Sequence, residues 1–429
     1  MNIENIAKHA KEASYKLAPL SSDLKNNTLL AVADNILKNS ELILAENRKD
    51  LEIALQAGMA SAPYNRLKLD DDKIHTIIKG IKDLVNLEDP VHKVLMATEL
   101  DKNLELYKVT YPIGVIGVIF ESRPDVVPQI ASLAIKSANA VILKGGSEAA
   151  FSNEIFVNVI NEALATVEGF PTNSVSLVKT REDVAKMLEL DEYIDLIIPR
   201  GSNALVKHIQ SNTRIPVLGH ADGICHIYID NEADLEKAVR ISVDSKIQYP
   251  SACNAVETIL VDKKLSKDFI NTVVAGLKNA EVVVKGDDFV QACADGVEHA
   301  DEEDWKTEYG EKIVSIKAVD SLIEAIDHIN NYGSGHTDSI ITENAQKAEI
   351  FMDLVDSAGV YHNASTRFAD GFRYGFGAEV GISTNKTHAR GPVGIDGLVI
   401  YKYKLFGNGQ TVGEYTGISA KKFTHRKLR

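Results

Sequence analysis

The sequence predicts an α/β protein with parallel sheets and more than one domain. Three observations support this prediction. The chain has 429 residues, which is more than a single hydrophobic core usually organises. Hydrophobic residues make up 45% and charged residues 25% of the chain, a globular balance that excludes a disordered or fibrous protein. Short apolar runs alternate with helix-patterned segments, as in βαβ units.

The first hundred residues are predicted to be helical. Ile6, Ala10, Ala13 and Leu17 recur at spacings of four and three, which places them on one helix face. Residues 24–57 are rich in Leu, Ala, Glu and Lys at similar spacing. The acidic run 70–72 is typical of a helix start, because acids favour helix N-termini.

Alternating strands and helices are predicted from residue 104 onward. A half-buried strand at 104–109 and a buried strand at 114–120 precede a helix that contains Val127 and Ile130. We then expect strand 140–143, a helix from the N-cap Ser147 to about 164, strand 175–178, helix 183–189, strand 194–198, a helix, and strand 215–218. A second block at 235–365 begins with helix 235–243 and strand 256–261. Residues 399–405 alternate as another strand, which we expect to pair with 104–110 and to need a partner subunit to cover its edge.

The charge and the cysteine count limit the function classes. Lys and Arg total 47 against 61 Asp and Glu, a net charge of −14, which disfavours a general nucleic-acid binder. The chain has three cysteines and no CxxC pair, so we expect no disulfide framework, no thiolate zinc site and a reducing compartment. The first seventeen residues lack the apolar core of a signal peptide, and the longest apolar run, 113–120, is too short to span a membrane. These features predict a cytoplasmic protein without nucleic-acid or membrane partners.

Two loops that follow predicted strands are candidates for anion binding. One is Lys144-Gly145-Gly146-Ser147 and the other is Arg200-Gly201-Ser202. Each offers a positive charge and backbone N–H groups at a helix start. The sequence contains neither GxGxxG nor GxxxxGK[ST]. Taken alone, a glycine-rich loop of this kind is more often only a turn.

Cys253 is the candidate nucleophile. It lies in Tyr-Pro-Ser-Ala-Cys-Asn-Ala at 249–255, where small neighbours allow a substrate to approach. Its own N–H group could stabilise an oxyanion. A free cysteine is equally typical of a small buried residue, and the residues leave both interpretations open. We expect Cys225 and Cys293 to be packing residues.

The segment 361–394 is the candidate site for an anionic ligand. It holds four Lys or Arg residues against two acids and is rich in glycine, which suits a negatively charged molecule. The residues proposed to bind substrate here are Asn363, Arg367, Arg373, His388 and Arg390.

Three segments carry a resemblance to a known family. Residues 111–149 (YPIGVIGVIFESRPDVVPQIASLAIKSANAVILKGGSEA), 249–261 and 367–398 resemble the gamma-glutamyl phosphate reductases of the aldehyde dehydrogenase superfamily. The resemblance implies an aldehyde-dehydrogenase-like α/β fold. We expect an NADPH-binding Rossmann-like domain at 1–100 and 118–232, a catalytic domain at 233–366, and a β oligomerisation flap at 101–117 and 397–412. Residues 367–396 would return to the cofactor and active-site region.

The resemblance also implies an activity. It predicts NADPH-dependent reduction of L-glutamyl 5-phosphate to L-glutamate 5-semialdehyde and phosphate, in proline biosynthesis. Cys253 matches the catalytic cysteine, whose thioester would accept the hydride. The alternative is a CoA-acylating or oxidising aldehyde dehydrogenase of the same fold. Implied partners are further copies of the chain, as a dimer or tetramer, with functional coupling to glutamate 5-kinase. No metal is implied.

Site residues follow from the same resemblance. Lys144, with Gly145 and Gly146, falls where aldehyde dehydrogenases hold the adenosine ribose, and Ser147 replaces a glutamate, which favours NADPH. Glu148 leaves the choice between NADPH and NADH open. Gly201 and Ser202 resemble the pair beside the pyrophosphate, and Glu308 the glutamate on the nicotinamide ribose.

The catalytic positions depart from the superfamily pattern. The general-base glutamate is missing, and His220 lies near its place, where it would bind or protonate the leaving phosphate. The oxyanion asparagine is replaced, so that Ser122 or Arg123 is the candidate donor, and Arg123 is also a substrate-binding candidate. Asn254, beside the nucleophile, completes the catalytic set.

Overall fold

The computed structural model describes residues 2–121, 123–220, 222–386 and 388–429. The chain divides into two compact units. The first unit comprises Met1–Gly201, Leu205–Leu218 and Val393–Arg429, and the second comprises Ser202–Ala204 and Gly219–Pro392. Residues 219–232, which we expected beside the cofactor, therefore belong to the same unit as Cys253.

The first unit begins with helices, as predicted for the first hundred residues, but residues 94–100 of that stretch belong to strand β1 (Val94–Asp101) and the prediction is wrong there. Asn2, Ser21 and Asp70 cap three of them, each accepting a backbone N–H from the first turn. The acidic run 70–72 is thus a capped helix start. The helices are α1 (Ile3–Leu17), α2 (Ser22–Lys38), α3 (Ser40–Gln56), α4 (Ser61–Leu67) and α5 (Asp71–Asn86).

A four-stranded parallel sheet follows in the first unit, in the order β5-β4-β3-β6. Its strands are apolar and mostly buried, as expected of a sheet covered on both faces. They are β3 (Val115–Phe120), β4 (Ala140–Lys144), β5 (Val175–Leu177) and β6 (Leu196–Arg200). The helices that follow them in the chain are α6 (Val126–Lys136), α7 (Ala150–Thr166), α8 (Arg181–Met187) and α9 (Asn203–Ser211).

Ser147 is not the N-cap that we predicted. It lies in a 3₁₀ turn, and α7 begins at Ala150. The buried carboxylate of Asp50 accepts the N–H groups of Phe151 and Ser152 at 3.1 and 2.8 Å. A side chain from α3 therefore satisfies donors that a local serine would otherwise have accepted.

The prediction of a strand at 215–218 is also wrong. Only Val217 forms a bridge, to Ile197 of β6. Pro216 has no N–H group to donate, although its carbonyl accepts the N–H of Ile197 at 2.9 Å. The helix predicted at 183–189 begins earlier, at Arg181, because Thr180 and Asp183 form a capping box.

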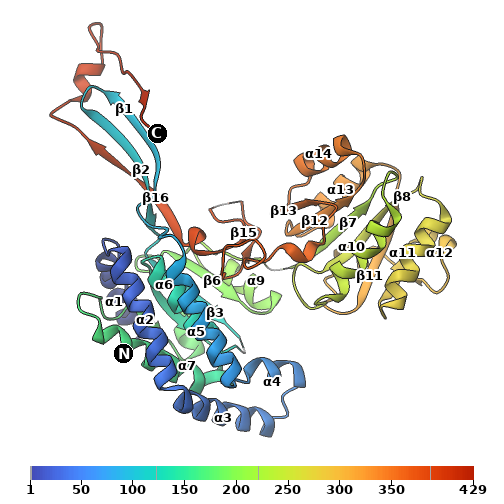
Figure 1. The fold of residues 1–429 in the computed structure, drawn as a ribbon, viewed down its shortest axis with the longest axis horizontal. Coiled ribbons are helices and arrows are strands. Elements are labelled where there is room, and N and C mark those ends of the chain that lie inside the picture. Colours follow the sequence, from blue (N-terminus) through green and yellow to red (C-terminus); the bar gives the residue numbers. More distant parts are fainter. Residues whose placement is uncertain (1, 122, 221, 387) are drawn as a thin grey trace. The chain divides into compact units, whose positions relative to one another are not determined.

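A second sheet in the first unit has the order β16-β2-β1-β17. Its strands are β1 (Val94–Asp101), β2 (Leu104–Pro112), β16 (Val399–Phe406) and β17 (Arg426–Lys427). The expected pairing of β2 with β16 is confirmed and is antiparallel, and β1, β2 and β16 lie side by side in Figure 1. We call this sheet the flap. β1 and β17 lie outside the ranges expected for it, and residues 115–117 belong to β3 instead.

The second unit is built on a seven-stranded sheet whose neighbouring strands are all parallel, in the order β10-β9-β11-β8-β7-β12-β13. The strands are β7 (Cys225–Ile229), β8 (Val256–Asp262), β9 (Val283–Gly286), β10 (Glu298–His299), β11 (Ile313–Val319), β12 (Thr337–Ile341) and β13 (Gly359–His362). The helices are α10 (Leu235–Ile247), α11 (Lys267–Asn279), α12 (Asp288–Cys293), α13 (Leu322–Tyr332) and α14 (Ala345–Leu354). A short antiparallel pair, β14 (Ile382–Ser383) and β15 (Gly391–Pro392), follows.

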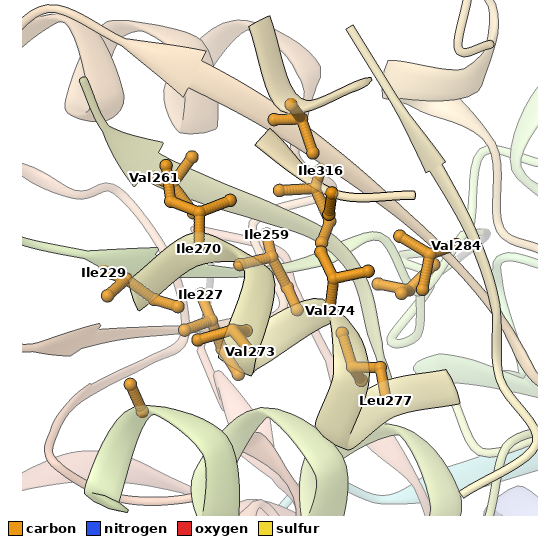
Figure 2. Close-up of a cluster of buried hydrophobic side chains, with 14 of the residues drawn as sticks. Ile227, Ile229, Ile259, Val261, Ile270, Val273, Val274, Leu277, Val284 and Ile316 are labelled. Carbon is orange, nitrogen blue, oxygen red and sulfur yellow. The ribbon is translucent and has the colours of Figure 1, made fainter. Parts of the chain in front are cut away.

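Helices cover both faces of this sheet. Successive side chains of β7 point to opposite faces, so Ile227 and Ile229 pack with α11, whereas Tyr228 packs with α13 and α14. Figure 2 shows the α11 side: Val273 and Leu277 lie against the strands there. Two cores thus hold the strands rigidly, and with them the loops at their ends.

No helix in the described part of the chain combines the length and the apolar character needed to cross a membrane.

Candidate active site

The candidate nucleophile lies at the amino edge of the seven-stranded sheet. Cys253 occupies a turn just before β8, Gly223 precedes β7, and His336 directly precedes β12. These three parallel strands are neighbours in the sheet, in the order β8-β7-β12. Residues that directly precede adjacent parallel strands meet at the same edge, so segments far apart in sequence converge on Cys253.

His336 is the partner of Cys253 in this structure. Its Nε2 lies 3.2 Å from the Cys253 Sγ, within hydrogen-bond reach. The other ring nitrogen, Nδ1, lies 2.9 Å from the hydroxyl oxygen of Thr337, which fixes the ring. The His336 ring is fully buried. A nucleophile, a base and a third group that orients the base form the usual arrangement for activating a thiol.

Sequence reasoning missed His336. It precedes a strand that was not individually predicted, and nothing in its local spacing marks it among the 12 histidines of the chain. The only signal is its place between Gly335 and the short strand Thr337–Ile341, which becomes meaningful once the strand order is known.

His220 is brought to the same edge. Its Nδ1 lies 2.8 Å from the carbonyl oxygen of Ile382. A carbonyl only accepts, so Nδ1 carries the proton and Nε2 keeps a lone pair. The His220 and His336 ring centroids are 4.9 Å apart, with the planes nearly perpendicular at 85°. The structure thus brings His220 beside His336 at the edge that holds Cys253.

Gly223 allows the backbone to close around Cys253. A Cβ atom at Gly223 would lie 2.3 Å from the Cys253 carbonyl oxygen and 2.6 Å from its Cα. The thiol of Cys225 also donates to that carbonyl, at 3.4 Å. Cys225 is fully buried, and burial raises the pKa of its thiol well above the usual value. Cys225 and Cys293 are buried, as we expected.

Asn254 anchors the turn. Its Nδ2 donates to the Ala369 carbonyl at 2.7 Å, and its own carbonyl accepts the Thr366 hydroxyl at 2.7 Å. The side-chain amide is therefore committed to segment 366–369 and holds Cys253 in place. In the described part of the chain, the N–H of Cys253 makes no hydrogen bond, so it can serve an oxyanion.

Arg367 and Arg373 form the positive part of this region. Arg367 is only 8% exposed, and its Nε donates to Gln248 at 2.9 Å in the loop that leads to Cys253. Arg373 donates to the Arg367 carbonyl at 2.9 Å. Burial, and then the Arg373 cation, lower the pKa of Arg367, whereas Cys253 raises it. The two guanidinium groups offer an anion site beside the thiol.

Three other substrate-binding candidates are placed differently. Asn363 follows β13, at the carboxyl edge of the sheet, and its side chain bonds the backbone of Thr342. The structure does not bring it to the amino edge with Cys253. Arg390 pairs with Asp356 at 3.2 Å and lies near Gly335, next to His336. His388 is exposed.

The first unit contains a hollow of about 740 Å³ at the carboxyl ends of β3 and β4. Lys144, Gly146, Ser147 and Glu148 line it, together with residues of α8 and α9. The Lys144 ammonium donates to the Gly145 carbonyl at 2.7 Å. The Glu148 carboxylate folds over Gly146, 2.0 Å from where a Cβ would stand, so a larger residue at 146 would displace the Glu148 side chain. The hollow has the size and the cation that a nucleotide requires.

The remaining cofactor candidates lie beyond β6. A Cβ at Gly201 would meet the Glu121 carboxylate at 2.5 Å. In the second unit, Asn203, which follows Ser202, donates to the Glu308 carboxylate at 3.0 Å. Glu308 is therefore adjacent to the predicted pyrophosphate loop.

Of the two candidate donors to the oxyanion, only Arg123 belongs to the described residues. Ser122 lies outside the described residues. Arg123, in the first unit, is half exposed and pairs with Asp125 at 2.9 Å.

Comparisons with known proteins agree with this fold. The family model for the aldehyde dehydrogenase family matches residues 1–296. A glyceraldehyde-3-phosphate dehydrogenase structure from Methanocaldococcus jannaschii shares the fold, with a TM-score of 0.66 at 16% identity over 95% of this chain and 94% of that one. The two units are thus those of an aldehyde dehydrogenase.

Proteins with higher sequence identity to this chain identify its family more narrowly. The chain is 55% identical over 433 residues to the gamma-glutamyl phosphate reductase of Brachyspira hyodysenteriae, with 100% of both chains covered. The corresponding protein of Methanococcoides burtonii is 53% identical, with 100% of this chain and 97% of that one covered. A crystal structure of the Thermotoga maritima gamma-glutamyl phosphate reductase matches with a TM-score of 0.94 and 40% identity, over 96% of this chain and 100% of that one. The chain belongs to the aldehyde dehydrogenase family and, within it, to the gamma-glutamyl phosphate reductases.

Proposed function

We propose that this protein reduces L-glutamyl 5-phosphate to L-glutamate 5-semialdehyde and phosphate with NADPH, as a step of proline biosynthesis. The observation that carries this proposal is the Cys253 thiol, 3.2 Å from the His336 imidazole, in a chain of the gamma-glutamyl phosphate reductase family. We assign the adenosine end of the cofactor to the first unit and the covalent chemistry to the second.

The first half of the reaction forms a thioester. His336 Nε2 accepts the thiol proton of Cys253, and the thiolate attacks the acyl carbon of the substrate. The N–H of Cys253 stabilises the negative oxygen of the tetrahedral intermediate. The C–O bond to phosphate then breaks and phosphate departs, with His220 as the residue that binds it. Arg367 and Arg373 hold the anionic substrate.

The second half releases the aldehyde. NADPH, when bound, supplies the hydride to the thioester carbon. Hydride addition leaves the thiohemiacetal as an oxyanion, and its collapse breaks the C–S bond and releases the aldehyde. His336 then returns to the Cys253 thiolate the proton that it accepted in the first half. Omission of a general-base glutamate protects the thioester from water, since hydrolysis would waste the acyl phosphate.

The cofactor hollow fits NADPH through Lys144. Its ammonium lies at the carboxyl end of β4, where a parallel sheet binds nucleotides. Ser147 adds no charge there, so it does not repel a 2′-phosphate. We assign Lys144, Gly145, Gly146, Ser147 and Gly201 to the adenosine and pyrophosphate, and Glu308 to the nicotinamide ribose.

The flap is our proposed subunit interface. β16 is an edge strand of its sheet, and Tyr401, Tyr403 and Leu405 on it are exposed by 46%, 57% and 57%. An apolar edge strand of this kind is covered in native proteins, and another copy of the chain would cover it. If sedimentation gave the same monomeric mass for the native protein and for Tyr403→Asp, this assignment would be wrong. Because acyl phosphates hydrolyse readily, we also propose functional coupling to the glutamate 5-kinase that makes the substrate, in the cytoplasm where thiols stay reduced.

The test is the reverse reaction, phosphate-dependent reduction of NADP⁺ by glutamate semialdehyde. The native protein should need phosphate and be indifferent to CoA, and Cys253→Ala should lose activity. Cys293→Ala, a cysteine of α12, is the matched control and should keep it. Activity that required CoA in place of phosphate would favour an acylating aldehyde dehydrogenase, and activity that survived in Cys253→Ala would reject the nucleophile.

A further inference from the structure

Cys253, His220 and His336 together have the composition of a metal site. One ligand atom from each, the thiol sulfur and two ring nitrogens, lies within 4.8 Å of the others. Thiolate sulfur and imidazole nitrogen are the ligands that Zn²⁺ prefers in proteins. The lack of a CxxC pair argued against a thiolate zinc site, but here the ligands come from three separate loops at one sheet edge.

The distances are close to those of a tetrahedral ion. With Zn–S of about 2.3 Å and Zn–N of about 2.0–2.1 Å, neighbouring ligand atoms stand roughly 3.3–3.6 Å apart. The Cys253 sulfur and the His336 Nε2 are 3.2 Å apart already. Other pairs are at most 4.8 Å apart, so closure of the site requires a side-chain shift of only about 1 Å.

The imidazole rings are held as metal ligands usually are. His220 Nδ1 donates to the Ile382 carbonyl at 2.8 Å, which leaves the Nε2 lone pair for a metal. His336 Nδ1 lies 2.9 Å from the Thr337 hydroxyl, and its Nε2 faces the thiol. Such outer contacts fix the tautomer and the orientation of ligating histidines.

We propose that His220, Cys253 and His336 bind a thiophilic divalent cation, Zn²⁺ foremost, in a three-residue site that leaves the fourth position to water or an anion. On binding, the Cys253 thiol releases its proton to solvent and its sulfur bonds the metal, without a change of oxidation state. A sulfur bound to metal does not attack an acyl phosphate, so the ion inhibits the enzyme reversibly. The binding stands on the geometry alone, whereas the inhibition rests on the proposed function of Cys253.

Binding is therefore measured apart from activity. Co²⁺ is titrated into the full-length reduced protein in phosphate-free buffer, and the thiolate-to-cobalt charge-transfer absorption is recorded. Zn²⁺ is then added to displace the Co²⁺ and bleach the band. We expect one ion per chain, and no band in Cys253→Ser.

The histidine ligands are tested by substitution. Loss of an outer contact weakens metal binding about 10- to 100-fold, so loss of a ligand in His220→Ala should weaken Zn²⁺ binding by at least about 100-fold. His336→Gln is a second variant, needed because this ring is fully buried. His299→Ala is the matched control, since that side chain is 66% exposed, and its Zn²⁺ affinity should equal that of the native protein.

The outcomes distinguish the metal site from the proposed catalytic role of Cys253. A native protein without a charge-transfer band, or a His220→Ala variant with native Zn²⁺ affinity, overturns the metal site. Tight Zn²⁺ binding with full activity preserves the site and rejects the proposed role of Cys253. Inhibition that a chelator reverses, with Zn²⁺ protecting Cys253 from alkylation, supports both.

Discussion

The Nε2 atom of His336 lies 3.2 Å from the Sγ atom of Cys253. The two residues are 83 positions apart in the chain, and they meet because β8 and β12 flank β7 in the sheet. This relationship places a proton acceptor beside the thiol without any helix end at the nucleophile. We therefore propose that this buried ring activates Cys253.

We expect His336→Ala to lower kcat by about 10²–10⁴-fold, the usual contribution of a general base. Alkylation of Cys253 by iodoacetamide should slow as well, because the thiolate loses its partner. His362→Ala is the control, since that ring bonds the Thr342 carbonyl at the opposite edge of the sheet. Equal alkylation rates for the native protein and His336→Ala would show that the ring does not activate the thiol.

Gly223→Ala should displace the nucleophile. The new Cβ would lie 2.3 Å from the Cys253 carbonyl oxygen. Because that oxygen is a backbone atom, the clash can be relieved only if the backbone at Cys253 shifts. A shift of about 1 Å at the reacting atom costs roughly 10²-fold in rate. Gly80→Ala, at a helix position with open space around it, should keep full activity and gain about 0.5–1 kcal/mol of stability. Native turnover in Gly223→Ala, measured by the phosphate-dependent assay, would contradict the tight packing.

Ser147→Glu should change the cofactor preference. A second carboxylate beside Glu148 in the hollow would repel the 2′-phosphate of NADPH. We expect kcat/KM for NADPH to fall at least about tenfold, or about 1.4 kcal/mol, with little change for NADH. Ser147→Gln provides the same bulk without the charge and should behave as the native protein does. A uniform loss with both cofactors would indicate a steric effect instead.

Lys246 and Glu257 should be sensitive to single substitution. Their charged atoms lie 2.7 Å apart, and the side chains are 0% and 1% exposed. Burial raises the pKa of Glu257 to about 7 and lowers that of Lys246. Removal of one partner of a buried pair costs about 3–5 kcal/mol, whereas replacement of both by apolar residues is often neutral. We expect urea unfolding to show a large loss for Lys246→Met and recovery in Lys246→Met with Glu257→Leu. A double variant less stable than Lys246→Met would refute this account.

His328 should make the second unit sensitive to acid. Burial, followed by His226 and Lys317, lowers the pKa of His328 to about 2. The unfolded chain takes up a proton there below about pH 6.5 and the folded chain does not, so folding stability is intact above pH 6.5 and falls as the pH drops. This group alone contributes a slope of about 1.4 kcal/mol per pH unit. His328→Phe should flatten the decline of unfolding free energy between pH 6.5 and 5, and an unchanged slope would exclude this source.

Local patterns predicted much of the fold because apolar periodicity follows burial. The helical character of residues 6–17 and 24–57, the strands β3 and β4, and the pairing of β2 with β16 were predicted from spacing. The strand Val94–Asp101 did not, because its Leu, Met, Ala and Glu residues favour helix, and only pairing with β2 makes it a strand. Ser147 was a reasonable local cap, but Asp50, from α3, took that role.

Residues of the candidate site could be predicted only where they belong to a local sequence motif. Cys253 and His220 were found through their neighbours in the sequence and lie together in the structure. His336 was missed because its relation to Cys253 depends on the strand order β8-β7-β12. Strand order cannot be predicted from the spacing of residues along the chain. Asn363 was chosen from its basic neighbourhood, although its side chain is occupied at the other edge.

The first unit consists of segments that lie before and after the second unit in the chain, and this affects how it folds during synthesis. β2 is complete by Pro112, yet its partner β16 begins at Val399, after all of the second unit. On the ribosome, the hairpin of β1 and β2 therefore waits with an open edge while Gly219–Pro392 emerges and folds. An unpaired edge is a site for wrong pairing between nascent chains. The strand that completes this sheet of the first unit is thus translated only after the whole second unit.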